Sequence, residues 1–108
     1  MRGTEFAQPA IFAVSYATAR LWQSWGLEPD ALVGHSLGEF VAATLAGVFE
    51  LDDALAIIAE RGRLMHDMPT GGMLAVRLSA QDVEPYLSAS VSLGGINAPE
   101  VVVLSGER

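Results

Sequence analysis

The stretch Gly34–Glu39, with the sequence GHSLGE, decides how this chain is interpreted. It contains the pattern Gly-x-Ser-x-Gly, which in some enzymes places a serine on a sharp turn between a strand and a helix. A short apolar run, Ala31–Val33, precedes it, and an apolar helical pattern continues to Ala46. This order predicts a nucleophile elbow. The Ser36 hydroxyl would be exposed at the turn, and the Leu37 backbone N–H at the helix N-terminus could stabilise an oxyanion.

Composition excludes several other classes of protein. The 108 residues are 51% hydrophobic, with a mean hydropathy of +0.35, so we expect a folded chain and a piece of a larger folded unit. A net charge of −7 without a basic cluster argues against nucleic-acid binding. No apolar run approaches the roughly 18 residues that span a bilayer, and no secretory signal opens the chain, so we expect no membrane contact and a cytoplasmic location.

No metal or disulfide chemistry is expected either. The chain has no cysteine, which excludes disulfides and thiolate catalysis. Its two histidines, His35 and His66, stand too far apart in sequence to form a metal site together.

The rest of the chain predicts an α/β fold in two parts, residues 1–70 and 71–108, separated at Gly71-Gly72. The expected helices and strands follow from apolar spacing and from Gly and Pro stops, with Gly26 as the stop of the first helix. Helices are predicted over Pro9–Trp25, Leu37–Ala46, Leu51–His66 (with Asp52 or Asp53 as cap) and Gln81–Ser88. Strands are predicted over Ala31–Val33, Met73–Leu78, Val91–Ile96 and Val101–Leu104, with a turn at Asn97–Glu100.

Arg61 is the second candidate functional residue. At about 100° per residue, Arg61 falls in the middle of an apolar arc of its helix, whereas Arg63 falls on the opposite side. A guanidinium directed into an apolar face is costly unless it is paired. Two interpretations follow: an internal salt bridge, for example with Glu39, or a site for a substrate carboxylate held by two parallel hydrogen bonds.

Five ordered motifs resemble the malonyl-CoA:acyl-carrier-protein transacylase family. The resemblance extends over the chain and is closer to the acyltransferase domain of a modular type I polyketide synthase, of which Leu21–Gly26 is typical. The motifs that carry it are Gln8–Ala10, Gly34–Glu39, Leu45–Val48, Arg61–Met65 and Asn97–Pro99.

The resemblance implies a function and a fold. Ser36 would be acylated from malonyl-CoA and would pass the acyl group to the phosphopantetheine thiol of an acyl carrier protein. Arg61 would bind the free malonyl carboxylate, with His35 and Gln8 in the substrate pocket, and the Leu37 N–H would be one oxyanion donor. Neighbouring polyketide synthase domains are implied as partners, and Leu37 resembles malonyl-selective members.

The resemblance also implies that residues 1–70 form part of a hydrolase-like subdomain and residues 71–108 a truncated ferredoxin-like one. The general-base histidine would then follow Arg108, and the second oxyanion donor would precede Met1.

Several alternatives stay open from the residues themselves. His35 is either a pocket wall or the base, and the former interpretation is favoured because elbow neighbours point in different directions. We interpret Glu39 as orienting and His66 as structural, and Asn97 as bonding within its turn. A serine hydrolase such as a thioesterase shares the elbow, although it has no use for a buried cation when its acyl groups are neutral. The isolated chain could also be catalytically inert.

Overall fold

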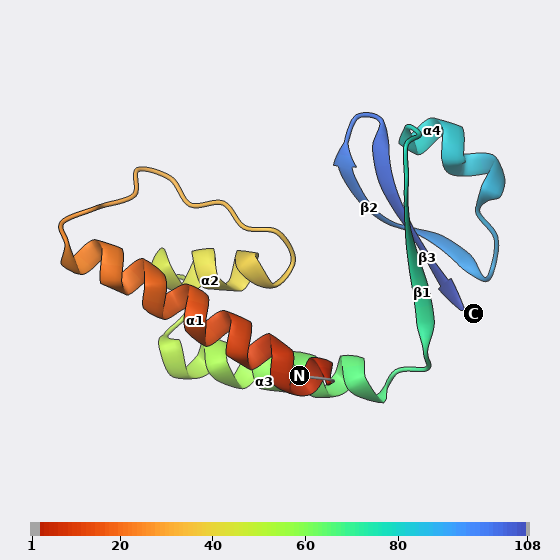
Figure 1. The fold of residues 1–108 in the computed structure, drawn as a ribbon. Helices are drawn as coiled ribbons and strands as arrows, with labels where there is room; N and C mark the ends of the chain where they lie inside the picture. The colour runs from red at the N-terminus through yellow and green to blue at the C-terminus, as the bar shows by residue number, and fades with distance from the viewer. Residues whose placement is uncertain (1–2, 108) are drawn as a thin grey trace. The chain divides into compact units, whose positions relative to one another are not determined.

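A computed structural model describes residues 3–107, which form two compact units. The first ends at Met68 and contains three helices; the second starts at Pro69 and contains a small sheet (Figure 1). The mixture of helices and sheet is that of an α/β chain. The assignment of the two units as hydrolase-like and ferredoxin-like subdomains stays a prediction. No helix among the described residues is both long and apolar enough to cross a membrane.

The first unit is built from α1 (Thr4–Ser24), α2 (Leu37–Leu45) and α3 (Leu51–Asp67). Helix α1 packs along α3 and also contacts α2 (Figure 1). Helices α1 and α3 are antiparallel, because Glu5 lies beside His66 at one end while Gln8 contacts Arg61 further along. This packing brings the start of α1 to the half of α3 that carries the candidate arginine.

Apolar side chains from all three helices form the core of this unit. Phe12 of α1, Val41 of α2, and Ala54 and Ile58 of α3 are buried together. Aromatic and aliphatic side chains pack around them: Tyr16, Leu37, Phe40, Leu45 and Phe49. The buried line of α3 continues from Ala54 and Ile58 to Gly62, so Arg61 lies beside the core.

The start of α1 and the cap of α3 differ from the predictions, whereas the stop of α1 agrees with them. Helix α1 starts at Thr4, so Pro9 lies inside it and not in its first turn. Helix α3 starts at Leu51, which places Asp52 and Asp53 in the first turn; they can favour the helix dipole but do not cap it. Gly26 was predicted correctly as the stop of α1, since its φ of 86° is a left-handed conformation that glycine adopts without strain.

The predicted strand at Ala31–Val33 is wrong for the described residues. The segment between α1 and α2 has no regular structure, and Val33 is 97% exposed. A strand requires a neighbouring strand to satisfy its backbone N–H and C=O groups. None of the described segments of this unit is a strand, so this run of three apolar residues has nothing to pair with.

The second unit is a three-stranded antiparallel sheet with one short helix. Its strands, β1 (Gly71–Val76), β2 (Val91–Ala98) and β3 (Val101–Glu107), pair in the order β1-β3-β2. Helix α4 (Ala80–Val83) and a 3₁₀ turn (Glu84–Tyr86) connect β1 to β2 and replace the single predicted helix, because Pro85 cannot continue it. Val83 and Val102 are fully buried in this second unit.

The hairpin between β2 and β3 is tighter than predicted. Strand β2 continues through Asn97 and Ala98, which leaves only Pro99 and Glu100 in the turn. Asn97 is therefore a strand residue next to a register shift, and its expected role as a turn residue is wrong.

Candidate active site

Ser36 occupies a strained backbone conformation immediately before α2. Its φ of 53° and ψ of −115° make it the one residue other than glycine with positive φ among those described. Such a conformation costs about 1–3 kcal/mol and persists only where the surroundings impose it. Gly34 is what permits the turn: a Cβ there would lie 2.2 Å from the backbone of Gly38. The turn leaves Ser36 exposed at the N-terminus of the helix.

The first backbone donors of α2 surround Ser36. The Gly38 N–H donates to the His35 carbonyl at 2.9 Å, and the Glu39 N–H donates to the Ser36 carbonyl at 3.2 Å. No group of residues 3–107 accepts the Leu37 N–H, which is one of the donors that any helix leaves unpaired in its first turn. This N–H follows directly on the serine and is available to a negatively charged oxygen at the elbow.

Arg61 reaches the serine from α3. Its Nη2 donates to Ser36 Oγ at 3.2 Å, and its Nη1 donates to the side-chain oxygen of Gln8. The guanidinium also lies over the Phe40 ring, 5.9 Å from the centroid, a distance at which a cation is attracted to the ring face. The half-buried guanidinium is thus held by one residue of α1 and two residues at or near the start of α2.

The charge of Arg61 is not neutralised within the first unit. No carboxylate of the described residues forms an ion pair with it, and the salt bridge considered for Glu39 does not form there. Glu39 itself is exposed in the first turn of α2, as the dipole favours. A cation beside a serine hydroxyl, held by neutral groups, can bind an anionic part of a substrate.

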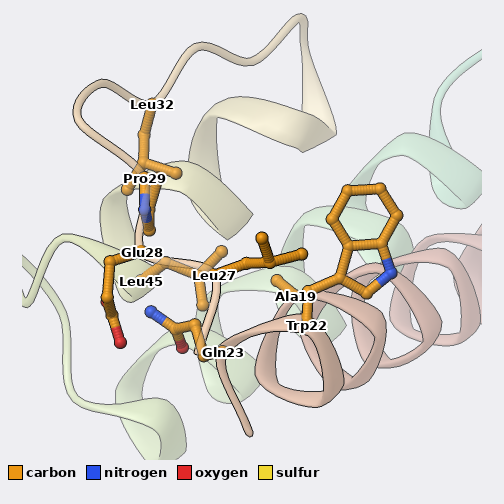
Figure 2. Close-up of a pocket in the computed structure, with 8 residues that line it drawn as sticks. All are labelled: Ala19, Trp22, Gln23, Leu27, Glu28, Pro29, Leu32 and Leu45. Atoms are coloured by element: carbon orange, nitrogen blue, oxygen red, sulfur yellow. The ribbon is translucent and has the colours of Figure 1, made fainter. Parts of the chain in front are cut away.

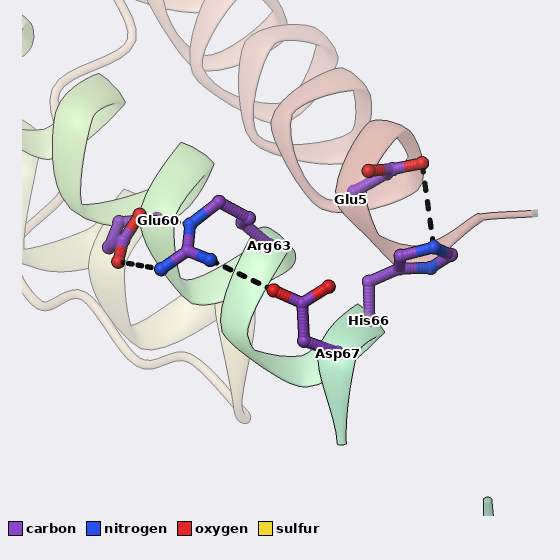
Figure 3. Close-up of polar contacts among 5 residues, drawn as sticks. All are labelled: Glu5, Glu60, Arg63, His66 and Asp67. Carbon is purple, nitrogen blue, oxygen red and sulfur yellow. Dashed lines mark hydrogen bonds and ion pairs between the residues drawn. The ribbon is translucent and has the colours of Figure 1, made fainter. Parts of the chain in front are cut away.

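Arg63, two residues further on, has the opposite surroundings. It pairs with Glu60 at 2.6 Å and with Asp67 at 2.8 Å on the exposed side of α3 (Figure 3). The hydrogen bond to Glu60 raises the pKa of Arg63 above its usual value, and the same bond lowers the pKa of Glu60. Exposed ion pairs of this kind contribute little to the free energy of unfolding. Replacing Arg63 therefore removes an arginine of the same helix without disturbing the site, which makes it a control for replacing Arg61.

The two histidines are not brought together. His35 is exposed, and no hydrogen bond joins it to Ser36 Oγ among the described residues. His66 lies at the end of α3, with its Nε2 3.8 Å from a carboxylate oxygen of Glu5 (Figure 3). Asn97 belongs to β2 in the second unit. Gln8, by contrast, is in contact with Arg61.

Sequence reasoning missed three residues at this site. Thr4 and Met65 both contact the Gln8 amide, and Phe40 lies beneath the guanidinium. Thr4 and Gln8 are four residues apart on one helix, a spacing that places side chains next to each other. Nothing in the sequence indicates that Met65 of α3 would meet them, because that contact depends on how closely the two helices approach.

Among the concave surfaces of the first unit, one lies along α1 and is lined by Ala7, Ala10, Ile11, Val14 and Ser15, and two others lie closer to α2. A groove of about 660 Å³ runs beside Arg61 and is lined mainly by apolar side chains of α3, with Phe40 from α2. A second pocket, of about 400 Å³, lies between the end of α1, the segment that follows it and α2 (Figure 2). Trp22, Leu27 and Leu45 line it with five other residues, and neither Ser36 nor Arg61 does. Of these three surfaces, the groove beside Arg61 is the one that belongs to the candidate active site.

Comparisons with known proteins place these features in a family. The chain matches the acyl transferase domain family over residues 1–108, and it belongs to that family. It is 50% identical over 109 residues to the mycoketide-CoA synthase of Mycobacterium tuberculosis, and 44% identical over 114 residues to the PKS-NRPS hybrid synthetase acdB of Aspergillus candidus. These matches cover 100% of this chain but only 3% and 5% of those proteins.

Solved structures agree with that assignment. The acyltransferase domain from the second module of the salinomycin polyketide synthase superimposes with a TM-score of 0.91 at 45% identity. The acyl transferase domain of ZmaA superimposes with a TM-score of 0.88 at 41% identity. Each match covers 97–98% of this chain and 26% of the other, so the chain is similar to about a quarter of each solved chain. Its resemblance to polyketide synthase acyltransferases is therefore confirmed.

Proposed function

We propose that the domain containing this chain transfers a malonyl-type acyl group from coenzyme A to the phosphopantetheine thiol of an acyl carrier protein, through an ester on Ser36. The observation that carries the proposal is the pairing of Ser36 with Arg61. The serine stands in a strained turn, and a cation without a carboxylate partner in the first unit donates to its Oγ at 3.2 Å. Family membership supports the acyl-transfer chemistry.

The proposed reaction has two matched halves. Ser36 Oγ attacks the thioester carbonyl of malonyl-CoA; a C–O bond forms, the C–S bond breaks and coenzyme A leaves as the thiol. The hydroxyl proton passes through a general base, for which we expect the histidine that the family resemblance places downstream. The thiol of the carrier protein then attacks the Ser36 ester: a new C–S bond forms, the C–O bond breaks, and the thiol proton passes through the base to the serine oxygen. In both halves the Leu37 N–H stabilises the tetrahedral oxyanion.

Arg61 distinguishes this reaction from simple ester hydrolysis. Malonyl-CoA carries a free carboxylate two carbons from the reacting carbonyl, and that carboxylate would take over the hydrogen bond that Nη2 now makes to Ser36. The exchange frees the serine hydroxyl for attack while the substrate is held by charge-assisted bonds. A hydrolase for neutral acyl groups would leave this cation without a partner.

The proposal implies partners and a location. The acyl donor is a coenzyme A thioester and the acceptor an acyl carrier protein, while neighbouring polyketide synthase domains are consistent with the large relatives that the chain matches. Leu37 favours malonyl among the extender units. The reaction needs no metal or covalently bound cofactor, and we expect it in the cytoplasm.

Mass spectrometry of the acylated enzyme tests the proposal. The intact domain is incubated with malonyl-CoA, digested and searched for the malonyl ester, which we expect on the peptide containing Ser36. Ser36→Ala should abolish the adduct. Ser24→Ala, which changes a serine whose Oγ donates to the Leu21 carbonyl at the end of α1, should retain it. An ester on another residue, or an undiminished adduct in Ser36→Ala, would overturn the proposal.

A further inference from the structure

Gln8 is the one buried side chain of the candidate active site whose polar atoms are all occupied by other side chains. It is 6% exposed on α1. Its Nε2 donates to Thr4 Oγ1 at 2.8 Å and to Met65 Sδ at 3.2 Å, while its Oε1 accepts from Arg61 Nη1. A glutamine in this state has no donor left for a substrate. Its effect on the reaction would have to act through Arg61.

Met65 determines which end of the Gln8 amide faces Arg61, and Thr4 holds the amide nitrogen in place. A thioether sulfur can accept a hydrogen bond but has no proton to donate, so the amide nitrogen must face Met65. The Thr4 hydroxyl accepts from the same nitrogen. If the amide were reversed, its N–H groups would oppose the N–H groups of Arg61 in a buried position, and both would lose a partner. Met65 thus keeps the amide oxygen directed at the guanidinium, and the hydrogen bond to Thr4 anchors the nitrogen on the other side.

An amide orients the guanidinium without neutralising it. A carboxylate in place of Gln8 would bind Arg61 more strongly but would cancel the charge that a substrate carboxylate requires. With Gln8 on Nη1, Ser36 on Nη2 and Phe40 beneath the plane, the guanidinium is fixed in direction and keeps its full charge.

We propose that Gln8, oriented by Thr4 and Met65, is a positioning residue that holds Arg61 for a carboxylate-bearing acyl group and thereby sets the preference for such groups over unsubstituted acyl groups. This inference rests on the proposed function. Its distinctive consequence is that Thr4, which lies two hydrogen bonds away from Arg61, affects substrate preference although it contacts neither Arg61 nor Ser36 through a hydrogen bond.

The test is the ratio of kcat/KM for malonyl-CoA to kcat/KM for acetyl-CoA in the intact domain. Both substrates are measured on one preparation, so a partly unfolded variant lowers both values equally and leaves the ratio unchanged. Thr4→Val and Gln8→Leu should lower the ratio by about 3- to 10-fold, the equivalent of one buried hydrogen bond. Gln8→Glu should lower it further, because the new carboxylate competes with the substrate for Arg61.

Thr18→Val is the matched control. It makes the same change on the same helix, where the Thr18 hydroxyl donates to the Val14 carbonyl, and it should leave the ratio at the wild-type value. Arg61→Ala serves as the reference for complete loss of the preference.

The outcomes separate the two claims. If Arg61→Ala abolishes the preference and Thr4→Val, Gln8→Leu and Gln8→Glu leave it unchanged, the role of Gln8 is wrong and the proposed function stands. If Arg61→Ala itself leaves the ratio unchanged, both are overturned.

Discussion

Gly34 and Ser36 form the turn on which the candidate chemistry depends. Ser36 adopts a positive φ, which most residues avoid, and only a residue without a side chain fits at Gly34 opposite the start of α2. The strain is confined to a turn of a few residues that exposes one hydroxyl and one unpaired N–H. Function at this scale is therefore a matter of backbone geometry as much as of side-chain chemistry.

Alanine should be damaging at one glycine of the elbow and tolerated at another. A Cβ at Gly34 would lie within 2.4 Å of three backbone atoms of Gly38 and Glu39, whereas a Cβ at Gly38 would meet nothing within 4 Å. Gly34→Ala should reduce the rate of Ser36 acylation by about 100-fold or more, as when a reacting group is displaced by an ångström. Gly38→Ala should remain within about 0.5 kcal/mol of wild type in stability. Stopped-flow acylation and thermal denaturation measure the two effects. Equal losses of the acylation rate in Gly34→Ala and Gly38→Ala would contradict the role of Gly34.

The candidate residues could be predicted in part from the sequence. Ser36 follows from the elbow pattern, and Arg61 from its inward position on a helical wheel. The contacts of Thr4, Met65 and Phe40 with this site could not be predicted, because they depend on distances between helices that no local pattern encodes. The partner of Arg61 was also open, since a wheel gives the direction of a side chain but not what it meets.

At the scale of elements, the close packing of α1 on α3 brings Gln8 to Arg61. Gly62 allows it: a Cβ there would lie 3.1 Å from the Glu5 Cα and 3.2 Å from the Thr4 and Glu5 carbonyl oxygens. These are backbone atoms of a helix and cannot rotate away as a side-chain end would. The helices therefore approach one another at the first turn of α1, directly beside the Thr4–Gln8 pair.

Gly62→Ala should separate the two helices slightly. Alanine is the better helix former by about 1 kcal/mol, but overpacking against backbone costs about 1–3 kcal/mol, so we expect a net loss of stability. The malonyl-to-acetyl ratio should fall as well, because Gln8 moves away from Arg61. Urea denaturation and the two-substrate assay test these expectations. Gly38→Ala is the control, because a Cβ there would meet nothing within 4 Å. Gly47 is not used as a control, because its positive φ would strain an alanine. A more stable variant with an unchanged ratio would contradict this account of α1–α3 packing.

Local patterns located most helices and strands, and the differences have physical reasons. A helix satisfies its hydrogen bonds within one segment, so apolar spacing and glycine stops located α2 and α3 to within about two residues. The run Ala31–Val33 has strand composition but no strand to pair with among the described residues. The start of α1 was misplaced because Pro9 is tolerated inside the helix, five residues after its beginning at Thr4.

At the scale of the whole molecule, many large apolar side chains are exposed in the described residues. Val33 is 97% exposed, Met73 75% and Trp25 67%. A monomeric protein in water rarely presents so much apolar surface. The two solved relatives described above are about four times as long, and their additional residues offer a means of covering it.

We therefore expect the isolated 108-residue chain to associate in solution and not to turn over. No hydrogen bond from a histidine reaches Ser36 Oγ among residues 3–107, and nucleophilic activation requires a base. Light scattering should detect oligomers, and transfer of malonyl to an acyl carrier protein should stay at background. A monomer with multiple turnovers that are lost in His35→Ala or His66→Ala would show that one of these histidines is the base.

The central claim is that Arg61 presents an unneutralised charge to the acyl group on Ser36. Two arginines of α3 allow a direct test: Arg61 donates to Ser36 and Gln8, while Arg63 pairs with Glu60 and Asp67 on the exposed side. The measurement is kcat/KM of the intact domain for malonyl-CoA and acetyl-CoA. Arg61→Ala should cost malonyl-CoA about 2–4 kcal/mol of transition-state binding and acetyl-CoA much less, while Arg63→Ala should leave both near wild type. Equal losses for both substrates in Arg61→Ala would contradict the claim and assign Arg61 a structural role.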